Sequence, residues 1–446
     1  MPHLFASEQA ERIDASALPA AELIKKQSAD SSVSAPLSRS EVSPRWAKRK
    51  VLARLSRLQS GELTLNDRHG VYRFGESRDS ELTATIDVHR ERFYRSVALG
   101  GGLGAAESYI RGDWDSSNLT HAMRVLAQNS QVLASVESGA ARLVRPLRVA
   151  SNWLRRNTRD GSRRNISAHY DLSNDFFALM LDPTMTYSSG IFETPESTMK
   201  MASIEKYDRI CRKLDLTADD HVLEIGTGWG GFAEHAAKHY GCRITTTTIS
   251  DQQYLYAENR FSEARLNDRI HLLKKDYRDL RGRYTKLVSV EMIESVGERY
   301  LPDYFANCSQ LLEPDGIMCL QAILIPDHRY ESYRHSVDFI QRYIFHGGFL
   351  PSMGAIANCV GHQTDFRFMH SEDFGPHYAQ TLALWSQAFW NNIDSVRALG
   401  FDERFIRTWN YYLSYCQAGF QENQIGVSQI VLSKPGFRKS SFNKLY

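Results

Sequence analysis

Short apolar runs alternate with longer amphipathic segments through the second half of the chain. The runs have the length and β-branched content of buried strands, and the segments between them repeat apolar residues at helical spacing. This alternation predicts an α/β fold built on a doubly wound sheet. Strands are predicted at His221–Ile225, Arg243–Ile249, Ile270–Leu273, Lys286–Val290, Gly316–Ile325, Thr364–Met369 and Ile425–Leu432. Helices are predicted at Phe232–His239, Gln252–Leu266, Leu301–Leu312, His377–Ile393 and Glu403–Phe420.

An earlier part of the chain predicts a smaller α+β unit. Three segments alternate polar and apolar residues as half-buried strands do: Glu62–Leu65, Val71–Phe74 and Leu82–Val88. The run Gly100–Tyr109 predicts a flexible glycine segment that turns into a helix, and Asn118 is placed to cap another helix.

These patterns divide the chain into five segments. We expect a disordered lead-in at 1–44, an N-terminal domain at 45–150, a basic linker at 151–165, the α/β domain at 166–435 and a basic tail at 436–446. The lead-in is rich in Ser, Ala and Glu and lacks a sustained apolar period. Within the α/β domain, residues 326–360 are too long for an ordinary connection, and such insertions usually carry function.

Composition narrows the class of protein. The chain has 446 residues, 42% of them hydrophobic, and a net charge of +2, which permits one large core and one smaller core. No stretch approaches the roughly 18 uninterrupted apolar residues of a membrane helix, and Met1–Ala20 lacks the order of a signal peptide, so we expect a cytoplasmic protein. The six cysteines form no C-x-x-C pair. We therefore expect reduced thiols and no metal site.

Two stretches mix cations with large apolar side chains. One is Arg45–Leu52. The other surrounds Trp153 and Leu154 with Arg142, Arg145, Arg148, Arg155, Arg156, Arg159, Arg163 and Arg164. Charge alone leaves three interpretations open: an anionic membrane surface, a nucleic acid, or a solvated linker.

A glycine-rich turn follows the first strand of the predicted α/β domain. The strand delivers Glu224, which is placed to accept from a cationic amine, and Gly226 and Gly228 leave no Cβ in the way of a ligand. The helix that follows presents its N-terminal amides. Gly231 falls at the wrong offset for the third glycine of a dinucleotide motif. The spacing therefore favours the S-adenosylmethionine loop of a class I methyltransferase, with a purely structural turn as the alternative.

The next two strands end in residues that suit a nucleoside. The second strand lacks the usual acidic residue for a ribose diol, and Gln253 is the candidate in its place because an amide both donates and accepts. Asp276 follows the third strand, in position to accept from an adenine amino group. The alternative for each is an ordinary solvated polar residue.

Five blocks, in order, resemble cyclopropane fatty acid synthases. They are His169–Phe177, Asp182–Gly190, Glu224–Gly231, Val290–Gly297 and Asp338–Pro351. The resemblance runs from about residue 80 to 433 and includes Gly104–Tyr109 and Gly112–Trp114. It implies a class I methyltransferase domain with a Rossmann-like sheet, preceded by a smaller N-terminal α+β domain that binds lipid.

The resemblance also implies a reaction: methyl transfer from S-adenosylmethionine to the double bond of an unsaturated phospholipid acyl chain, which closes to a cyclopropane. The substrate then lies in a bilayer, so the basic stretches are expected on an anionic phospholipid surface rather than on nucleic acid. The carbocation needs electron-rich neighbours, for which Tyr170, Phe176, Tyr343 and Phe345 are candidates, with core packing as the alternative.

Site residues follow from the resemblance, position by position. Beside Glu224, the cofactor contacts are expected at Tyr187, Ser188, Gly226, Gly228, Ile249, Gln253 and Asp276. A bound bicarbonate that serves as base would be held by Ser189, Glu294, Gln321, Ile323 and Tyr378. Catalytic roles are expected for Glu294, Tyr378, Ser189, Gln321 and Tyr170.

Two of these positions depart from the common bacterial pattern, which has cysteine where Ser189 stands and histidine where Gln321 stands. Both residues still hydrogen-bond an oxyanion, but glutamine brings no positive charge. A cation that is not deprotonated at the new methyl loses a neighbouring proton instead, which leaves a methyl- or methylene-branched chain.

Other classes stay open at this point. A nucleic-acid methyltransferase is disfavoured because the Asn- or Asp-Pro-Pro-aromatic signature is absent. Methylation of a small molecule and a non-catalytic lipid-binding scaffold are the remaining alternatives. The sequence does not decide whether the chain forms a homodimer.

Overall fold

The computed structural model describes residues 44–75, 82–134 and 172–438. Several predictions lie outside these residues: most of the lead-in, the basic stretch from Arg142 to Arg164 with the predicted linker, and most of the C-terminal tail. Tyr170 is also outside them.

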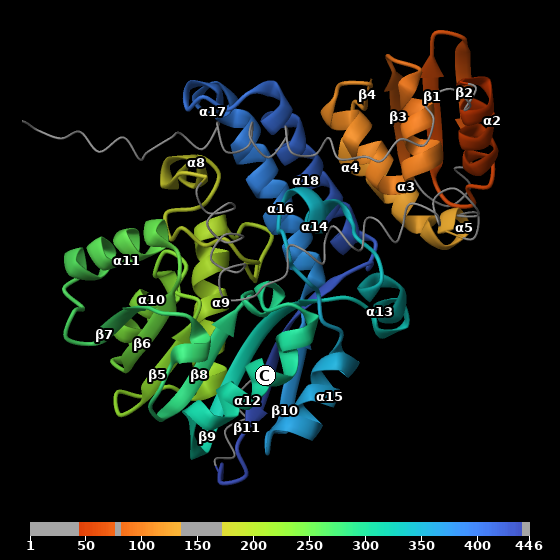
Figure 1. Ribbon diagram of the computed structural model, residues 1–446. Coiled ribbons are helices and arrows are strands. Elements are labelled where there is room, and N and C mark those ends of the chain that lie inside the picture. Colours follow the sequence, from red (N-terminus) through yellow and green to blue (C-terminus); the bar gives the residue numbers. More distant parts are fainter. Residues whose placement is uncertain (1–43, 76–81, 135–171, 439–446) are drawn as a thin grey trace, which may run out of the picture. The chain divides into compact units, whose positions relative to one another are not determined.

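A seven-stranded sheet lies at the centre of the larger part of the chain (Figure 1). Its order is β10-β11-β9-β8-β5-β6-β7. The five strands from β9 to β7 are parallel, and β11 runs antiparallel to both β9 and β10. The strands are β5 (His221–Ile225), β6 (Arg243–Thr248), β7 (Ile270–Lys274), β8 (Tyr284–Val290), β9 (Leu312–Leu324), β10 (Arg367–Asp373) and β11 (Gly426–Ser433). The predicted α/β fold is confirmed, and the chain reverses its winding direction on either side of β5.

Helices cover both faces of this sheet. Val222 packs with α9, α10 and α11 on one face, and its neighbour Leu223 packs with α12 and α15 on the other, as alternation along a strand requires. The helices are α8 (Asn174–Ala178), α9 (Met199–Leu214), α10 (Gly231–Tyr240), α11 (Asp251–Glu263), α12 (Leu301–Leu311), α15 (Met353–Gln363), α16 (Gly375–Asn391), α17 (Ile393–Ala398) and α18 (Glu403–Gln421). Every helix predicted in this part of the chain is present within three residues of its predicted ends.

The long connection at 326–360 is itself helical. It contains α13 (Asp327–Arg334), α14 (Phe339–Tyr343) and the start of α15. Beyond it, α16 and α18 lie side by side, and the rings of Tyr378 and Phe420 stack with centroids 4.4 Å apart. This helical pair and α14 belong to the same hydrophobic core as the N-terminal elements.

A smaller four-stranded sheet with the order β2-β1-β3-β4 forms near the start of the described chain. Its strands are β1 (Glu62–Asp67), β2 (Gly70–Phe74), β3 (Thr83–Val88) and β4 (Trp114–Asp115), with α2 (Pro44–Leu55), α3 (Arg92–Ile110), α4 (Leu119–Gln128) and α5 (Ser130–Ala134). The predicted cap is confirmed, because the Asn118 side chain accepts from the backbone N–H of His121 at 3.0 Å.

The prediction for the glycine run is correct in part. A helical half does follow the run and ends at Ile110, but another half precedes it, because α3 already begins at Arg92 and kinks at Gly101, where φ is 59° and ψ is −139°. A Cβ on Gly104 would lie 2.0 Å from the backbone oxygen of Ser96. The glycines therefore allow a close approach of the two helical halves, which a periodicity argument does not detect.

Arg407 of α18 connects the smaller sheet to the helical pair. Its guanidinium donates to the backbone oxygens of Tyr109 at 2.6 Å and Trp114 at 2.8 Å, and it lies 4.0 Å from the centroid of the Tyr109 ring. Arg124 of α4 pairs with Glu422 just beyond α18 at 2.5 Å. These contacts fix α18 against the N-terminal elements.

Two features are absent from the described residues. None of their helices is long and apolar enough to cross a membrane, and they contain no group of three or more His, Cys, Asp or Glu side chains arranged for a metal ion. All six cysteines are free, and four of them are buried.

Candidate active site

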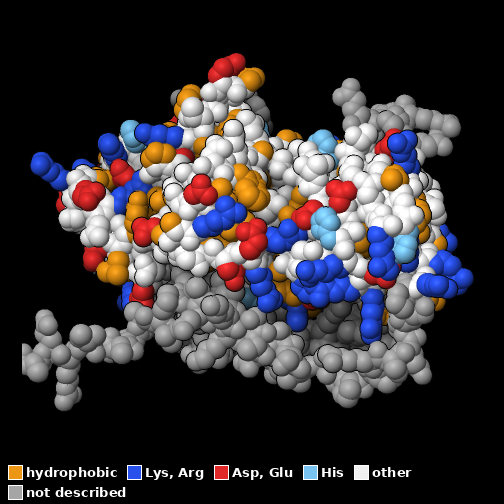
Figure 2. Space-filling model, turned by 90° about the horizontal axis from the view of Figure 1, so that it is seen from above, with side chains coloured by type: hydrophobic (Ala, Val, Ile, Leu, Met, Phe, Trp, Pro, Cys, Tyr) orange, Lys and Arg blue, Asp and Glu red, His pale blue; other side chains and the backbone are white. Residues whose placement is uncertain are grey.

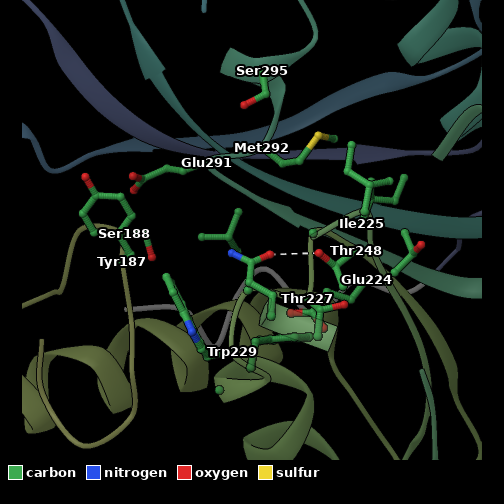
Figure 3. A pocket seen from close by; sticks show the side chains of 18 of the residues that line it. Tyr187, Ser188, Glu224, Ile225, Thr227, Trp229, Thr248, Glu291, Met292 and Ser295 are labelled. Carbon is green, nitrogen blue, oxygen red and sulfur yellow. Dashed lines mark hydrogen bonds between the residues drawn. The ribbon is translucent and has the colours of Figure 1, made fainter. Parts of the chain in front are cut away.

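One pocket opens at the carboxyl ends of the parallel strands, where the winding direction reverses. All eight residues predicted to contact the cofactor line it: Tyr187, Ser188, Glu224, Gly226, Gly228, Ile249, Gln253 and Asp276. Figure 3 shows the pocket with Trp229 and Thr227 on one side and Met292 and Ser295 on the other. The structure therefore gathers residues from four strand ends and from the segment before α9 around one space.

The glycine turn forms the floor of this pocket. Gly226 and Gly228 have φ values of 103° and 53°, which favour glycine. A Cβ on Gly228 would meet no protein atom within 4 Å, so the missing side chain leaves the space open to a ligand. Gly230 caps α10 in the left-handed conformation, and a Cβ there would lie 2.7 Å from the Phe261 ring. In this turn Gly230 is therefore required by packing against Phe261, and Gly228 leaves space for a ligand.

Glu224 presents a buried acidic group to the pocket. Its side chain is 3% exposed and accepts from the Thr246 hydroxyl at 2.6 Å. Burial raises its pKa to about 8, and the Thr246 hydrogen bond and the charge of Lys206 oppose this rise. Without a ligand the carboxyl therefore keeps its proton below about pH 8, and a cation that enters the pocket favours the ionised form and pairs with it.

Gln253 and Asp276 occupy the places expected for nucleoside contacts. The Gln253 side-chain oxygen accepts from the Thr248 hydroxyl at 2.8 Å (Figure 3), and its nitrogen donates to none of the described residues. Both oxygens of Asp276 accept from the Arg278 guanidinium, at 2.8 and 2.6 Å. Its Oδ1 also accepts from the Arg278 backbone N–H at 3.0 Å, so the backbone and side chain of Arg278 together hold this carboxylate at the pocket.

Glu291 is the acidic residue that the sequence reasoning missed. It follows β8 with a φ of 48° and lines the pocket. Its Oε1 accepts from the Ser189 N–H at 3.0 Å and from the Gln321 amide at 2.7 Å, and its Oε2 accepts from the Tyr378 hydroxyl at 2.7 Å. Desolvation raises the pKa of Glu291, and Lys206 and these three donors act in the opposite direction.

Glu294 lies one turn further on, beside Ile323. Its Oε1 accepts from the Ile323 N–H at 2.6 Å, and its Oε2 is buried without a hydrogen-bond partner among the described residues. Desolvation and the charge of Glu291 raise the pKa of Glu294 to about 8. Glu294, the predicted catalytic residue, does not line the pocket, whereas Glu291 does.

The residues predicted to hold bicarbonate do come together, but they surround carboxylates of the protein itself. Ser189, Gln321 and Tyr378 bind Glu291, and Ile323 binds Glu294. A free anion bound among these residues would meet the negative charge of Glu291. The arrangement therefore does not fit the bicarbonate that the resemblance implied.

Lys206 of α9 is a second residue that the sequence reasoning missed. It is fully buried, and its ammonium donates to the Ser188 hydroxyl at 2.5 Å. Burial lowers its pKa to about 8, while Glu291, Asp182 and Glu224 act in the opposite direction. This cation balances the acidic groups at the pocket.

Of the aromatic residues predicted to stabilise the carbocation, Phe345 lies near the pocket, whereas Phe176 and Tyr343 make other contacts. Phe345 lies near Tyr187, which stacks on Trp385 at a centroid distance of 5.2 Å and lines the pocket. Phe176 is fully buried between the rings of Phe401, Phe405 and Trp409, so its core-packing alternative is correct. The Tyr343 hydroxyl donates to Glu107 of α3 at 3.0 Å.

Comparison with known proteins identifies the family. The model of the family described as "Mycolic acid cyclopropane synthetase" matches residues 157–430. The chain belongs to this family. It is 41% identical to the tuberculostearic acid methyltransferase UfaA1 of Mycobacterium tuberculosis, over 79% of this chain and 84% of that protein. It is 34% identical to the cyclopropane-fatty-acyl-phospholipid synthase of Escherichia coli K12, over 81% of this chain and 91% of that protein.

A solved structure of a family member agrees with the fold. The mycolic acid cyclopropane synthase CmaA1, in complex with S-adenosylhomocysteine and CTAB, superposes with a TM-score of 0.58 at 31% identity, over 61% of this chain and 98% of that one. The resemblance to cyclopropane synthases and the class I methyltransferase fold are thus confirmed. The chain is an S-adenosylmethionine-dependent methyltransferase, and the family supports methyl transfer to lipid acyl chains by cyclopropanation or methylation.

Proposed function

We propose that this enzyme transfers the methyl group of S-adenosylmethionine to the double bond of an unsaturated phospholipid acyl chain and releases a methyl- or methylene-branched chain. The observation that carries this proposal is the pocket, in which predicted cofactor residues and the carboxylate of Glu291 line one space. The branched product is favoured because Ser189, Gln321 and Tyr378 each donate to the carboxylate of Glu291, and because the 41% identical relative is a tuberculostearic acid methyltransferase. A cyclopropane is the second candidate, on the strength of the 34% identical synthase of Escherichia coli.

The residues at the pocket fit S-adenosylmethionine. Gly228 leaves space where a ligand approaches the turn, and Glu224 is a buried partner for a cationic amine. We assign the ribose to Gln253 and the adenine amino group to Asp276. When bound, the cofactor supplies an electrophilic methyl group on a positively charged sulfur.

The acyl chain must meet this methyl group away from water, because an alkene is a weak nucleophile and needs positioning. The π electrons of the alkene form the new carbon–carbon bond, and the electron pair of the broken S–CH₃ bond stays on sulfur. A carbocation is left on the neighbouring carbon. The ring faces of Tyr187 and Phe345 are the nearby groups that stabilise it, at about 2 kcal/mol each when desolvated.

The N-terminal elements are proposed as the lipid-binding domain, within the predicted limits 45–150. In the described residues of that region these arginines are exposed: Arg45, Arg49, Arg57, Arg68, Arg73, Arg90, Arg92, Arg95 and Arg111. Four of them pair with acidic residues, Arg68 with Glu91, and Arg90, Arg92 and Arg111 with the buried Asp113. Trp46 of α2 is 39% exposed beside Lys50. On the face drawn in Figure 2, Lys and Arg side chains gather at the right of the view. Each cation near an anionic bilayer contributes about 1 kcal/mol, so we propose peripheral binding at the inner face of the membrane.

Lipid analysis tests this function. The purified chain is incubated with S-adenosylmethionine and vesicles of monounsaturated phospholipid, and the acyl chains are examined by mass spectrometry. A gain of one methylene unit is expected, and chromatography against ring and branched standards identifies the product. Vesicles of saturated phospholipid are the control and should show no gain. Absence of product from the unsaturated vesicles, with S-adenosylhomocysteine still raising the melting temperature, would reject the proposed substrate and leave the scaffold alternative.

A further inference from the structure

Glu291 is held at the pocket by an arrangement that fixes both its backbone and its side chain. Its N–H donates to the backbone oxygen of Gln321 at 2.8 Å, and its carboxylate accepts from the side-chain amide of the same residue. A φ of 48° is unfavourable for a residue with a side chain. Such a conformation persists only where the surroundings determine it, and strained residues cluster at functional sites.

The hydrogen bonds leave one acceptor position on this carboxylate. Oε1 takes two donors, Ser189 and Gln321, whereas Oε2 takes only the Tyr378 hydroxyl. A carboxylate oxygen has two lone pairs, so Oε2 retains one. Figure 3 shows the Glu291 side chain directed toward Tyr187 and Ser188, which line the same pocket. The vacant acceptor position therefore belongs to an oxygen at the proposed reaction site.

The charges around Glu291 come from several elements. Lys206 of α9 is the cation that acts on it, and Glu294 adds a negative charge after β8. Tyr378 of α16, Gln321 of β9 and Ser189 before α9 contribute neutral donors. A second anion here would meet the negative charges of Glu291 and Glu294, with Lys206 as the cation that opposes them. The donors from Ser189, Gln321 and Tyr378 are directed to the carboxylate of Glu291.

We propose that Glu291 replaces a bound inorganic anion and is itself the base that takes the proton from the carbocation. This inference rests on the proposed methyl transfer. The proton passes to Oε2. If it leaves a carbon beside the cation, the electron pair of the broken C–H bond forms the double bond of a methyl-branched chain; if it leaves the new methyl, the pair forms the third bond of a ring. A methylene-branched chain forms when a hydride first shifts to the cationic carbon, so that the methyl then stands beside the cation. The lipid becomes neutral, and Glu291 returns to its ionised form by releasing the proton to water before the next turnover.

The direct test measures dependence on bicarbonate in the full-length protein. Turnover on monounsaturated phospholipid vesicles is compared in buffer purged of carbon dioxide and in the same buffer with added bicarbonate at constant pH and ionic strength. We expect less than a twofold difference. Stimulation by twofold or more would overturn the inference while leaving the methyl transfer intact. Absence of product in both buffers would overturn the methyl transfer and the inference with it.

Two variants separate the base from its surroundings. Glu291→Gln keeps the shape of the side chain and should lose at least 100-fold in turnover, with affinity for S-adenosylhomocysteine unchanged within threefold. Glu291→Gly suits the positive φ and opens the position. It should be inactive in purged buffer and gain at least tenfold when bicarbonate or formate is added. Glu193→Gln changes an exposed carboxylate near the site and should match the wild type.

Two results with these variants would contradict the inference. Turnover of either Glu291 variant at the wild-type rate in purged buffer would remove Glu291 from the chemistry. Failure of both anions to restore any activity to Glu291→Gly would show that the carboxylate and a free anion do not share one position. If neither variant folds, the bicarbonate dependence of the wild type still decides.

Discussion

Replacement of Glu224 by glutamine tests the electrostatics of the cofactor pocket. The carboxyl is 3% exposed and has one hydrogen bond, from the Thr246 hydroxyl at 2.6 Å. Glutamine has nearly the same shape and keeps an oxygen for that donor, but it does not ionise. The substitution therefore removes the cost of a buried negative charge.

The magnitude follows from the pKa, which rises from 4.5 to about 8 on folding. Each pH unit of difference is worth about 1.4 kcal/mol, so an upper limit is about 5 kcal/mol. Relaxation around the charge lowers this limit, and we expect about 2 to 3 kcal/mol. Between pH 4.5 and 8 the folded carboxyl keeps its proton while the unfolded one has lost it. The free energy of unfolding of the wild type therefore falls as pH rises through this interval.

The assay is urea unfolding of the protein without ligand at several values from pH 5 to 8. This interval lies below the region where Lys206, with its pKa lowered to about 8, contributes the opposite slope. We expect Glu224→Gln to become more stable relative to the wild type by about 2 to 3 kcal/mol across the interval. Glu263→Gln, at an exposed position of α11, is the control and should give a constant difference. The reasoning would be refuted if the difference in free energy of unfolding between Glu224→Gln and the wild type did not change with pH. It would also be refuted if the wild type became more stable relative to the variant as pH rises.

Three further predictions concern turnover, the glycine turn and α18. Glu294→Gln should keep its affinity for S-adenosylhomocysteine and lose most of its turnover on lipid vesicles, because it removes the acid beside Glu291; unaltered turnover would exclude Glu294 from the mechanism. Gly228→Val should weaken S-adenosylhomocysteine binding more than tenfold by calorimetry, since its side chain enters the pocket, whereas Gly361→Ala on α15 should bind as the wild type does. Arg407→Ala should lower the free energy of unfolding in urea by about 3 kcal/mol through the loss of two charged hydrogen bonds, against no more than about 0.5 kcal/mol for the exposed Arg404→Ala; equal effects would contradict this.

The strands of the larger sheet were predictable where burial gives them an apolar pattern. The prediction for β5 matches His221–Ile225 at both ends. The edge strand β10 was predicted three residues too early, because most of its residues are exposed and polar. The start of β9 was missed because Glu313, Pro314 and Asp315 resemble a turn, although the strand continues through them.

The residues of the cofactor pocket were easier to predict from the sequence than the contacts of Glu291. Strand order brings the ends of β5, β6 and β7 together, so residues at those ends share a site wherever the fold is doubly wound. The contacts of Glu291 with Ser189 and Tyr378 span 102 and 87 positions in the chain. Local patterns contain no signal at that range, and a positive φ at a glutamate is not readable from sequence.

Signals for both missed residues were nonetheless present. Ser189 and Gln321 depart together from the cysteine and histidine of the common pattern, and both contact Glu291 in the structure. Lys206 occupies a position in the buried stripe of α9, between Ser203 and Ile210, where an apolar residue is expected. A charged residue in such a stripe is a reason to look for a buried partner.

Helix α18 contacts the N-terminal elements near its first turns and the pocket region near its last turns. Arg407 grips the backbone of the N-terminal elements, and Phe420, about 20 Å further along the same rod, stacks on the ring whose hydroxyl holds Glu291. One helix and one pair of rings therefore join the elements that we propose to bind lipid to the carboxylate that we propose as the base.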